Sequence, residues 1–171
     1  QDTIVGIENF IARGSIDTNI EGDSSASVLE TDAGNDTIQG GSGNDTIYAG
    51  QGDDSVYGGS GDDVIYASDG RDFEDGGEGN DTLAINGYST SITDVTYNLL
   101  EGSQGITGGP LTQNAFANFE NFSIGQTFWG ETIDVDWNLT IVGTDGANRI
   151  QTSEGNDTIS GGGGNDTLLS G

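Results

Sequence analysis

Residues 31–84 read TDAGNDTIQ, GGSGNDTIY, AGQGDDSVY, GGSGDDVIY, ASDGRDFED and GGEGNDTLA, six successive units of nine residues with no slip of phase. The fourth residue of every unit is Gly and the sixth is Asp, while the eighth is apolar in every unit but one, where it is Glu74. The phase returns over residues 143–169 as GTDGANRIQ, TSEGNDTIS and GGGGNDTLL, with Asn148 in a sixth position. A strict short period of this kind indicates a solenoid whose repeats pack on their neighbours.

Each recurring position of the repeat, called a column below, holds its residue type for a physical reason. Gly at the first, second and fourth positions permits positive φ and close backbone approach, so that six residues can turn sharply with their carbonyls pointing inward. The sixth-position carboxylate then joins those carbonyls around a hard cation. The seventh to ninth residues predict a short strand whose eighth side chain points to the interior. In the fifth unit, Arg71 beside Asp72 and Glu74 in the inward column predict a weakened site or a distorted strand, with Phe73 taking the buried role.

The charge balance points to the same ligand class and excludes others. The 171 residues include 29 acidic and 3 basic ones, for a net charge of −26, and no His, Cys or Lys. These absences exclude Ser-His-Asp and Cys-His nucleophiles, the usual zinc sites, disulfides and Schiff bases. The charge repels nucleic acid, and no apolar run approaches a membrane span, so neither nucleic-acid binding nor membrane insertion is expected. The chain needs external cations to fold compactly.

The pattern GGxGxD followed by x-U-x, with U apolar, closely resembles the RTX (repeats-in-toxin) hemolysin-type nonapeptide. The resemblance implies an all-β fold, a right-handed parallel β-roll or β-helix solenoid loaded with Ca2+, with two nonapeptides in each turn and a more irregular β segment in the middle. It also implies that calcium lies between a loop and the loop one turn later, with roughly four to seven ions in all. The Asp pairs expected on that scheme are Asp36 with Asp54, Asp45 with Asp63, Asp54 with Asp72, and Asp63 with Asp81. The full set of expected metal ligands is the carboxylates of Asp36, Asp45, Asp54, Asp63, Asp72, Asp81, Asp157 and Asp166 and the backbone of Gly34, Gly41, Gly43, Gly50, Gly52, Gly59, Gly61, Gly70, Gly77 and Gly79.

Composition divides the chain into four parts. These are degenerate β-coils over 1–30, the calcium-binding block over 31–84, an aromatic-richer irregular β segment over 85–142, and a second repeat block over 143–171. Within the third part, alternating apolar residues predict strands at 92–99 and 133–139, with a loop over 101–110 and a short helix or irregular structure over 114–122. We interpret its aromatic residues as core, with a carbohydrate groove as the alternative.

Two similar phrases precede the good repeats: Ile7-Glu8-Asn9-Phe10 and Phe119-Glu120-Asn121-Phe122. The phrases are 112 residues apart and the corresponding repeats 121, a difference of one nonapeptide. This spacing indicates one copy, and the start of a second, of a larger tandem unit. We therefore expect the polypeptide to continue in both directions, or further copies or flanking repeats to stack end to end.

The functional hypothesis is a calcium-binding segment of a larger secreted bacterial protein, extracellular or at the cell surface, that folds when it meets calcium outside the cell. The resemblance implies export by a type I route. A structural role, in a surface layer, adhesin or filament, is favoured by the tandem repeats. The alternative is a C-terminal secretion and folding module of a secreted protease, lipase, polysaccharide epimerase or toxin. Catalysis by Asp134 with Asp136 or Glu131 is a third reading, but alternating carboxylates are typical of a solvated strand face, so no enzymatic activity is expected of this segment.

Overall fold

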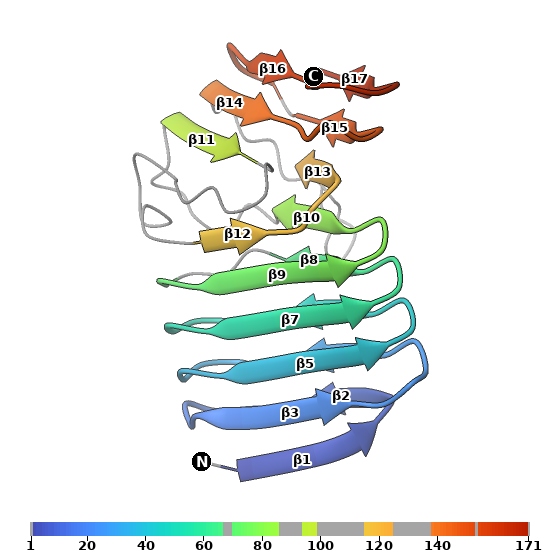
Figure 1. Ribbon diagram of the computed structural model, residues 1–171. Coiled ribbons are helices and arrows are strands. Elements are labelled where there is room, and N and C mark those ends of the chain that lie inside the picture. The colour runs from blue at the N-terminus through green and yellow to red at the C-terminus, as the bar shows by residue number, and fades with distance from the viewer. Residues whose placement is uncertain are drawn as a thin grey trace.

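The computed structural model describes residues 2–66, 70–85, 94–98, 115–124, 138–152 and 154–170. Within these ranges every regular element is a strand, and the strands stack into the coils of a parallel β-roll (Figure 1). One sheet has the order β1 (Asp2–Ile7), β3 (Thr18–Gly22), β5 (Thr37–Ser42), β7 (Ser55–Ser60), β9 (Phe73–Glu78) and β12 (Ala115–Ala117). The facing sheet has the order β2 (Asn9–Ile11), β4 (Val28–Glu30), β6 (Thr46–Tyr48), β8 (Val64–Tyr66), β10 (Thr82–Ile85), β13 (Asn121–Ile124), β15 (Arg149–Gln151) and β17 (Thr167–Leu169). A third sheet holds β11 (Asp94–Asn98), β14 (Asn138–Val142) and β16 (Thr158–Ser160).

The strand register confirms two nonapeptides in each turn. Thr37 in β5 pairs with Ser55 in β7, and Thr46 in β6 pairs with Val64 in β8, so each residue lies beside the one 18 positions later. Successive nonapeptides therefore alternate between the two sheets. The seventh to ninth residues form these strands because Thr, Ile, Val and Tyr suit a pleated surface with one face buried.

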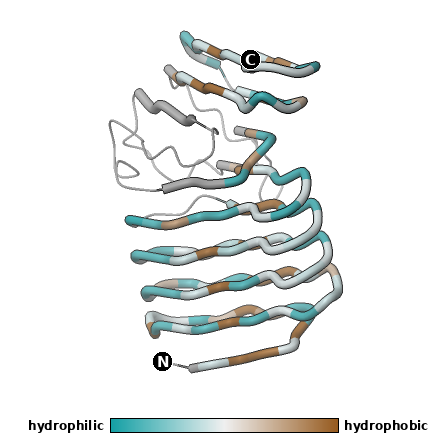
Figure 2. Tube along the Cα trace, viewed as in Figure 1, coloured by the Kyte–Doolittle hydropathy of each residue, from teal (hydrophilic) through white to brown (hydrophobic). Residues whose placement is uncertain are grey.

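The core runs along the axis of the roll between the two sheets. The eighth-position residues Ile38, Ile47, Val56, Ile65 and Leu83 are all fully buried in one cluster, as the column predicts. Apolar segments recur at equivalent places on successive coils in Figure 2. Because each turn contributes only two such side chains, no turn has a complete core without its neighbours.

The fifth unit differs from its expectation. Strand β9 is regular and pairs with β7 without a bulge, and Glu74 takes the inward position, where its exposed fraction is 0%. Phe73 does not take the buried role: it is half-buried on the outer face, where its ring contacts that of Tyr57 at a centroid distance of 5.5 Å. The pairing of Gly59 with Gly77 further along the two strands fixes the register, so the side-chain alternation leaves Glu74 no other direction.

In the described part of the middle segment, β12 and β13 extend the two facing sheets, whereas β11 pairs with β14 in the third sheet. Strand β11 lies inside the predicted strand at 92–99. Of the short helix or irregular structure predicted over 114–122, only residues 118–120 are irregular, and the described residues on either side form β12 and β13. Phe119 and Phe122 are buried in the core, as the interpretation of the aromatic residues requires. Most of the strand predicted at 133–139, and all of the loop predicted at 101–110, lie outside the described residues. Among the described elements none is a helix that could span a bilayer.

Candidate metal sites

The loops between strands form two rows, one along each edge of the roll (Figure 1). The first loop row precedes β5, β7 and β9 and carries Asp36, Asp54 and Asp72. The second loop row precedes β6, β8 and β10 and carries Asp45, Asp63 and Asp81. Sixth-position Asp residues therefore stack in two columns, with consecutive members one turn apart.

In each column, one carboxylate oxygen ties two turns together. The N–H of Asp36 donates to Oδ1 of Asp54 at 2.8 Å, and the N–H of Asp54 donates to Oδ1 of Asp72 at 2.9 Å. In the second row the N–H of Asp45 donates to Asp63, and that of Asp63 donates to Asp81, both at 2.8 Å. The structure thus brings together all four Asp pairs expected from the sequence.

The other oxygen of these carboxylates marks the candidate sites. All six side chains are at most 2% exposed, and Oδ2 of Asp36, Asp45, Asp54, Asp63 and Asp81 is buried without a hydrogen-bond partner. A buried ionised oxygen without a partner is costly, and a bound cation removes that cost. Burial, followed by the charges of the neighbouring acids, raises the pKa of Asp54 to about 7, and burial likewise raises the pKa of Asp63 and Asp81 to about 6. Each column therefore presents a line of anionic oxygens suited to a hard cation such as Ca2+.

The first-position glycines bring main-chain carbonyls to the second row. A Cβ built on Gly58 would lie 2.4 Å from both Oδ2 of Asp63 and the carbonyl oxygen of Gly76, so these two oxygens are separated by no more than twice that distance. Gly40 is placed in the same way against Asp45. Positive φ is not the reason for these glycines, because within the described part of the repeats the left-handed backbone occurs only at the second and fourth positions. In the second row glycine is needed at the first position because a side chain there would displace the carboxylate.

All ten glycines expected as backbone ligands have positive φ: Gly34, Gly43, Gly50, Gly52, Gly61, Gly70 and Gly79 lie in the loops, and Gly41, Gly59 and Gly77 lie near the ends of β5, β7 and β9. Their carbonyls as calcium ligands remain a prediction. Among the described residues no three His, Cys, Asp or Glu side chains gather closely enough to hold a metal by themselves. A hexa- to octacoordinate ion such as Ca2+ would therefore take main-chain oxygens as well as the two stacked carboxylates.

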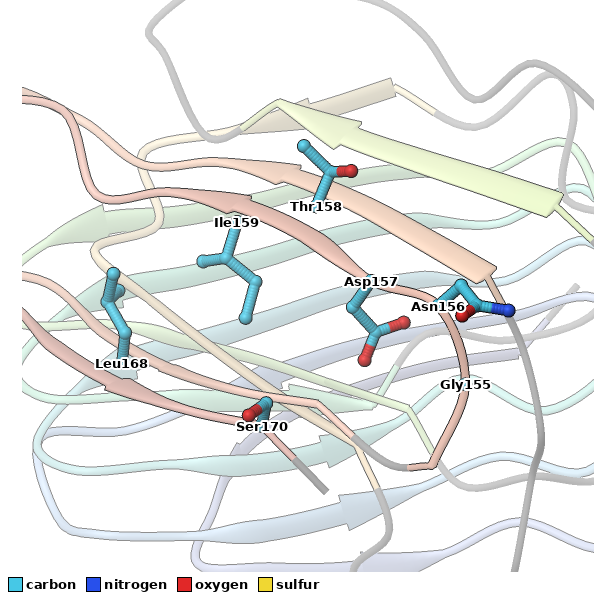
Figure 3. A pocket seen from close by; sticks show the side chains of 7 residues that line it. All are labelled: Gly155, Asn156, Asp157, Thr158, Ile159, Leu168 and Ser170. Atoms are coloured by element: carbon cyan, nitrogen blue, oxygen red, sulfur yellow. The ribbon is translucent and has the colours of Figure 1, made fainter.

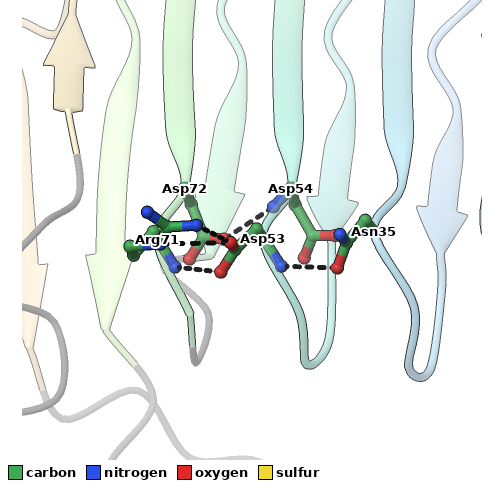
Figure 4. Close-up of polar contacts among 5 residues, drawn as sticks. All are labelled: Asn35, Asp53, Asp54, Arg71 and Asp72. Atoms are coloured by element: carbon green, nitrogen blue, oxygen red, sulfur yellow. Dashed lines mark hydrogen bonds and ion pairs between the residues drawn. The ribbon is translucent and has the colours of Figure 1, made fainter.

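Sequence reasoning missed a second ladder, formed by the fifth position of the repeat. The N–H of Asp53 donates to Oδ1 of Asn35 at 3.0 Å, and the N–H of Arg71 donates to Oδ1 of Asp53 at 3.1 Å (Figure 4). This ladder runs opposite to the sixth-position one, since here the later turn donates to the earlier turn. Its signal in the sequence is a fifth column made only of Asn, Asp and Arg in residues 31–84.

Arg71 adds a cation to the first loop row. Its guanidinium donates to Oδ2 of Asp53 through Nε at 3.1 Å and also through Nη2, and both side chains are exposed. The hydrogen bonds from Arg71 lower the pKa of Asp53. Asp53 points along the outer edge of the loops while Asp54 and Asp72 are buried (Figure 4), so this pair lies beside the Asp column and not within it.

The C-terminal block has fewer carboxylates in each pair of stacked loops. Oδ1 of Asp157 accepts the N–H of Leu139 at 3.0 Å, and Oδ1 of Asp166 accepts that of Asn148 at 3.0 Å, so these two Asp residues lie in different rows. Oδ1 of Asn148 is buried without a hydrogen-bond partner, as the Asp oxygens are, and lies against Gly143. Asp157 lines a cavity of about 620 Å³ with Ile159 (Figure 3). The step from Asn148 to Asp166 thus repeats the second-row geometry with one charge fewer.

The carboxylates considered for catalysis, Glu131, Asp134 and Asp136, lie outside the described residues. A search of curated proteins finds no match to this chain. The family model of the RTX calcium-binding nonapeptide repeat, which describes four copies, matches residues 21–56, 48–83 and 140–171, more than half of the chain. Together with the 18-residue register and the stacked Asp columns, this match shows that the chain belongs to the family of RTX calcium-binding repeats.

Proposed function

We propose that this chain is a calcium-triggered folding segment of a larger secreted bacterial protein, with a structural role at the cell surface or outside the cell. The observation that carries the proposal is the set of buried Asp Oδ2 atoms that have no hydrogen-bond donor. Calcium-binding repeats of this family are structural, which agrees with a role other than catalysis for the segment.

The charges explain why calcium would act as a trigger. In the folded roll without cations, Asp54 is flanked in its column by Asp36 and Asp72, and all three are buried. Their repulsion, and the conformational entropy of the Gly-rich loops, favour the unfolded chain. A divalent ion between two carboxylates reverses the sign of the electrostatic energy, so that the free energy of binding becomes free energy of folding. Scarce cytosolic calcium would then keep the chain unfolded until export.

A calcium titration of the intact chain, followed by far-ultraviolet circular dichroism, tests this proposal. We expect little strand signal in excess chelator and a cooperative rise with millimolar calcium, while magnesium at the same concentration has a weaker effect because it demands a smaller octahedral shell. Strand signal already complete in chelator and unchanged by calcium would refute the trigger. The matched control is added sodium chloride at equal ionic strength, which screens charge without bridging carboxylates.

The structural role is supported by the facing sheet that runs from β2 in the first coils to β17 in the second repeat block, which makes a rod stiffened by stacked loops. We further propose that copies or flanking repeats associate along the rod axis. Sedimentation velocity at rising calcium concentration tests this part separately: a monomer at all concentrations would exclude self-association while leaving the folding trigger intact.

A further inference from the structure

The second loop row continues beyond the repeats through residues from the middle segment. After Asp81 the next member of the column is not an Asp 18 residues later but Glu120, 39 residues later. The N–H of Asp81 donates to Oε2 of Glu120 at 2.8 Å, the same distance that joins the N–H of Asp63 to Oδ1 of Asp81. Glu120 therefore occupies the place of the next Asp in the column.

Asn118 supplies the carbonyl that a glycine supplies elsewhere in this row. A Cβ built on Gly76 would lie 2.2 Å from the carbonyl oxygen of Asn118 and 2.8 Å from Oδ2 of Asp81. At Gly58 the corresponding atoms are the carbonyl oxygen of Gly76 and Oδ2 of Asp63. Asn118 has φ 54°, and among the described residues it is the one non-glycine with positive φ. Asn tolerates this backbone better than most residues. Gly76, which supplies the equivalent carbonyl one turn earlier, has no positive φ, so Asn118 presents the same carbonyl from a different backbone conformation.

Independent evidence for a ligand comes from Asp81 itself. Its side chain is 0% exposed, and Oδ2 is buried without a hydrogen-bond partner on the side of Gly76 and Asn118. We propose that Asp81, Glu120 and the carbonyl of Asn118 form a further calcium site. Asn118 and Glu120 lie outside the residues that match the family model, and the site rests on the proposed use of calcium by the second loop row.

This site would join the two repeat blocks. The Asn118 side chain donates through Nδ2 to Oδ1 of Asp75 at 2.7 Å, and Asn148 donates through Nδ2 to the carbonyl oxygen of Glu120 at 2.7 Å. The same short segment thus contacts the last turn of the first block and the first turn of the second. An ion held by Asp81 and Glu120 couples the folding of one block to that of the other.

Calcium stoichiometry of the intact chain tests the site. Equilibrium dialysis at saturating free calcium should show one ion fewer per chain for Glu120→Gln than for the unchanged protein, because the amide keeps the hydrogen bond from Asp81 but loses the charge. Glu8→Gln is the matched control, since Glu8 holds the same place in the phrase Ile7-Glu8-Asn9-Phe10 but is exposed and follows no Asp column. Its stoichiometry should be unchanged. Equal stoichiometry for all three proteins would overturn the proposal, as would an equal loss in both variants.

Crystals of the unchanged protein grown with Tb3+ give a readout that does not depend on how the variant folds. An anomalous peak beside Asp81 and Glu120, in addition to peaks beside Asp45 and Asp63, would support the site. Peaks in the repeat loops without one at Glu120 would overturn it and leave the proposed function standing. Absence of every peak, with no calcium bound in dialysis, would refute the proposed function as well.

Discussion

Replacing Asp54 by Asn should change the stability of the roll in opposite directions with and without calcium. Asp54 accepts the N–H of Asp36 through Oδ1 and is 2% exposed, and its pKa is raised from 3.8 to about 7 in the cation-free fold, by burial first and by neighbouring acids second. Asn keeps an acceptor oxygen for Asp36 and removes the charge. The variant should therefore be more stable than the unchanged protein in chelator and less responsive to calcium.

The magnitude follows from the pKa shift. A shift of about three units at about 1.36 kcal/mol each sets a ceiling of about 4 kcal/mol for the cost of ionising Asp54 in the fold. Water and salt screen part of this interaction, so we expect about 2 kcal/mol at pH 8. Because the pKa of Asp54 is higher in the fold than in the unfolded chain, the fold loses stability as pH rises through about 7. Below the unfolded value of 3.8 the carboxyl group is protonated in both states and has no effect. The advantage of the variant should vanish near pH 4.

Unfolding monitored by circular dichroism in chelator, with trimethylamine N-oxide added to populate the fold, measures the first effect. The calcium midpoint measures the second, and it should rise severalfold because Asp54 belongs to two of the expected pairs. Asp53→Asn is the control: Asp53 is exposed, and Asn already occupies its column at Asn35. A variant at Asp54 that is less stable than the unchanged protein in chelator at pH 8, or whose advantage persists at pH 4, would refute the reasoning.

Three further predictions concern the glycine columns, the core and the acids as a group. Gly58→Ala should destabilise the calcium-loaded roll by about 1–3 kcal/mol in thermal unfolding, because the new Cβ meets Oδ2 of Asp63 and the Gly76 carbonyl. Gly146→Ala is the control and should be neutral or slightly stabilising, because Gly146 has no positive φ and its Cβ would meet only Thr144 Oγ1, at 3.5 Å. Glu74→Leu should raise the melting temperature in saturating calcium, because it replaces a fully buried acid in an aliphatic column. Glu78→Leu, on the exposed surface, is the control and should not raise it. A lower melting temperature for Glu74→Leu would contradict the prediction and show that the acid stabilises the fold. In chelator, lowering the pH from 8 to 5 should increase strand content, because the raised pKa of Asp54, Asp63 and Asp81 makes the fold take up protons as pH falls through about 7 to 6; a flat profile would contradict this.

The repeat period, together with the resemblance to RTX repeats, was sufficient to predict the coils, their register and the Asp pairs. The period places Asp45 and Asp63 18 residues apart, and the resemblance supplied the two units per turn that bring them side by side. The burial of the eighth-position side chains could also be predicted, because alternation along a strand places Ile47 and Ile65 on its inner face.

Contacts that depend on atoms outside the period could not be predicted in this way. The burial of Glu74 reverses the expectation from its charge, because the backbone pairing of β7 with β9 decides where the side chain points. The contact of Glu120 with Asp81 spans 39 residues, an interval that no multiple of the repeat gives. Gly58 is needed because a Cβ there would lie too close to Oδ2 of Asp63, and this distance cannot be predicted from the residue types in a column.

The segment around Asn118 and Glu120 also bears on how such a solenoid can be lengthened. Insertions between coils need not be multiples of nine residues, because the residues that follow the insertion restore the register. Asn118 supplies the carbonyl, Glu120 supplies the carboxylate of the column, and Phe119 and Phe122 supply the core. An engineered excursion of arbitrary length could be grafted after a second-row Asp if it ends in Asn-Phe-Glu-Asn-Phe, as residues 118–122 do. Natural arrays built this way could acquire foreign segments without losing the pitch of the rod.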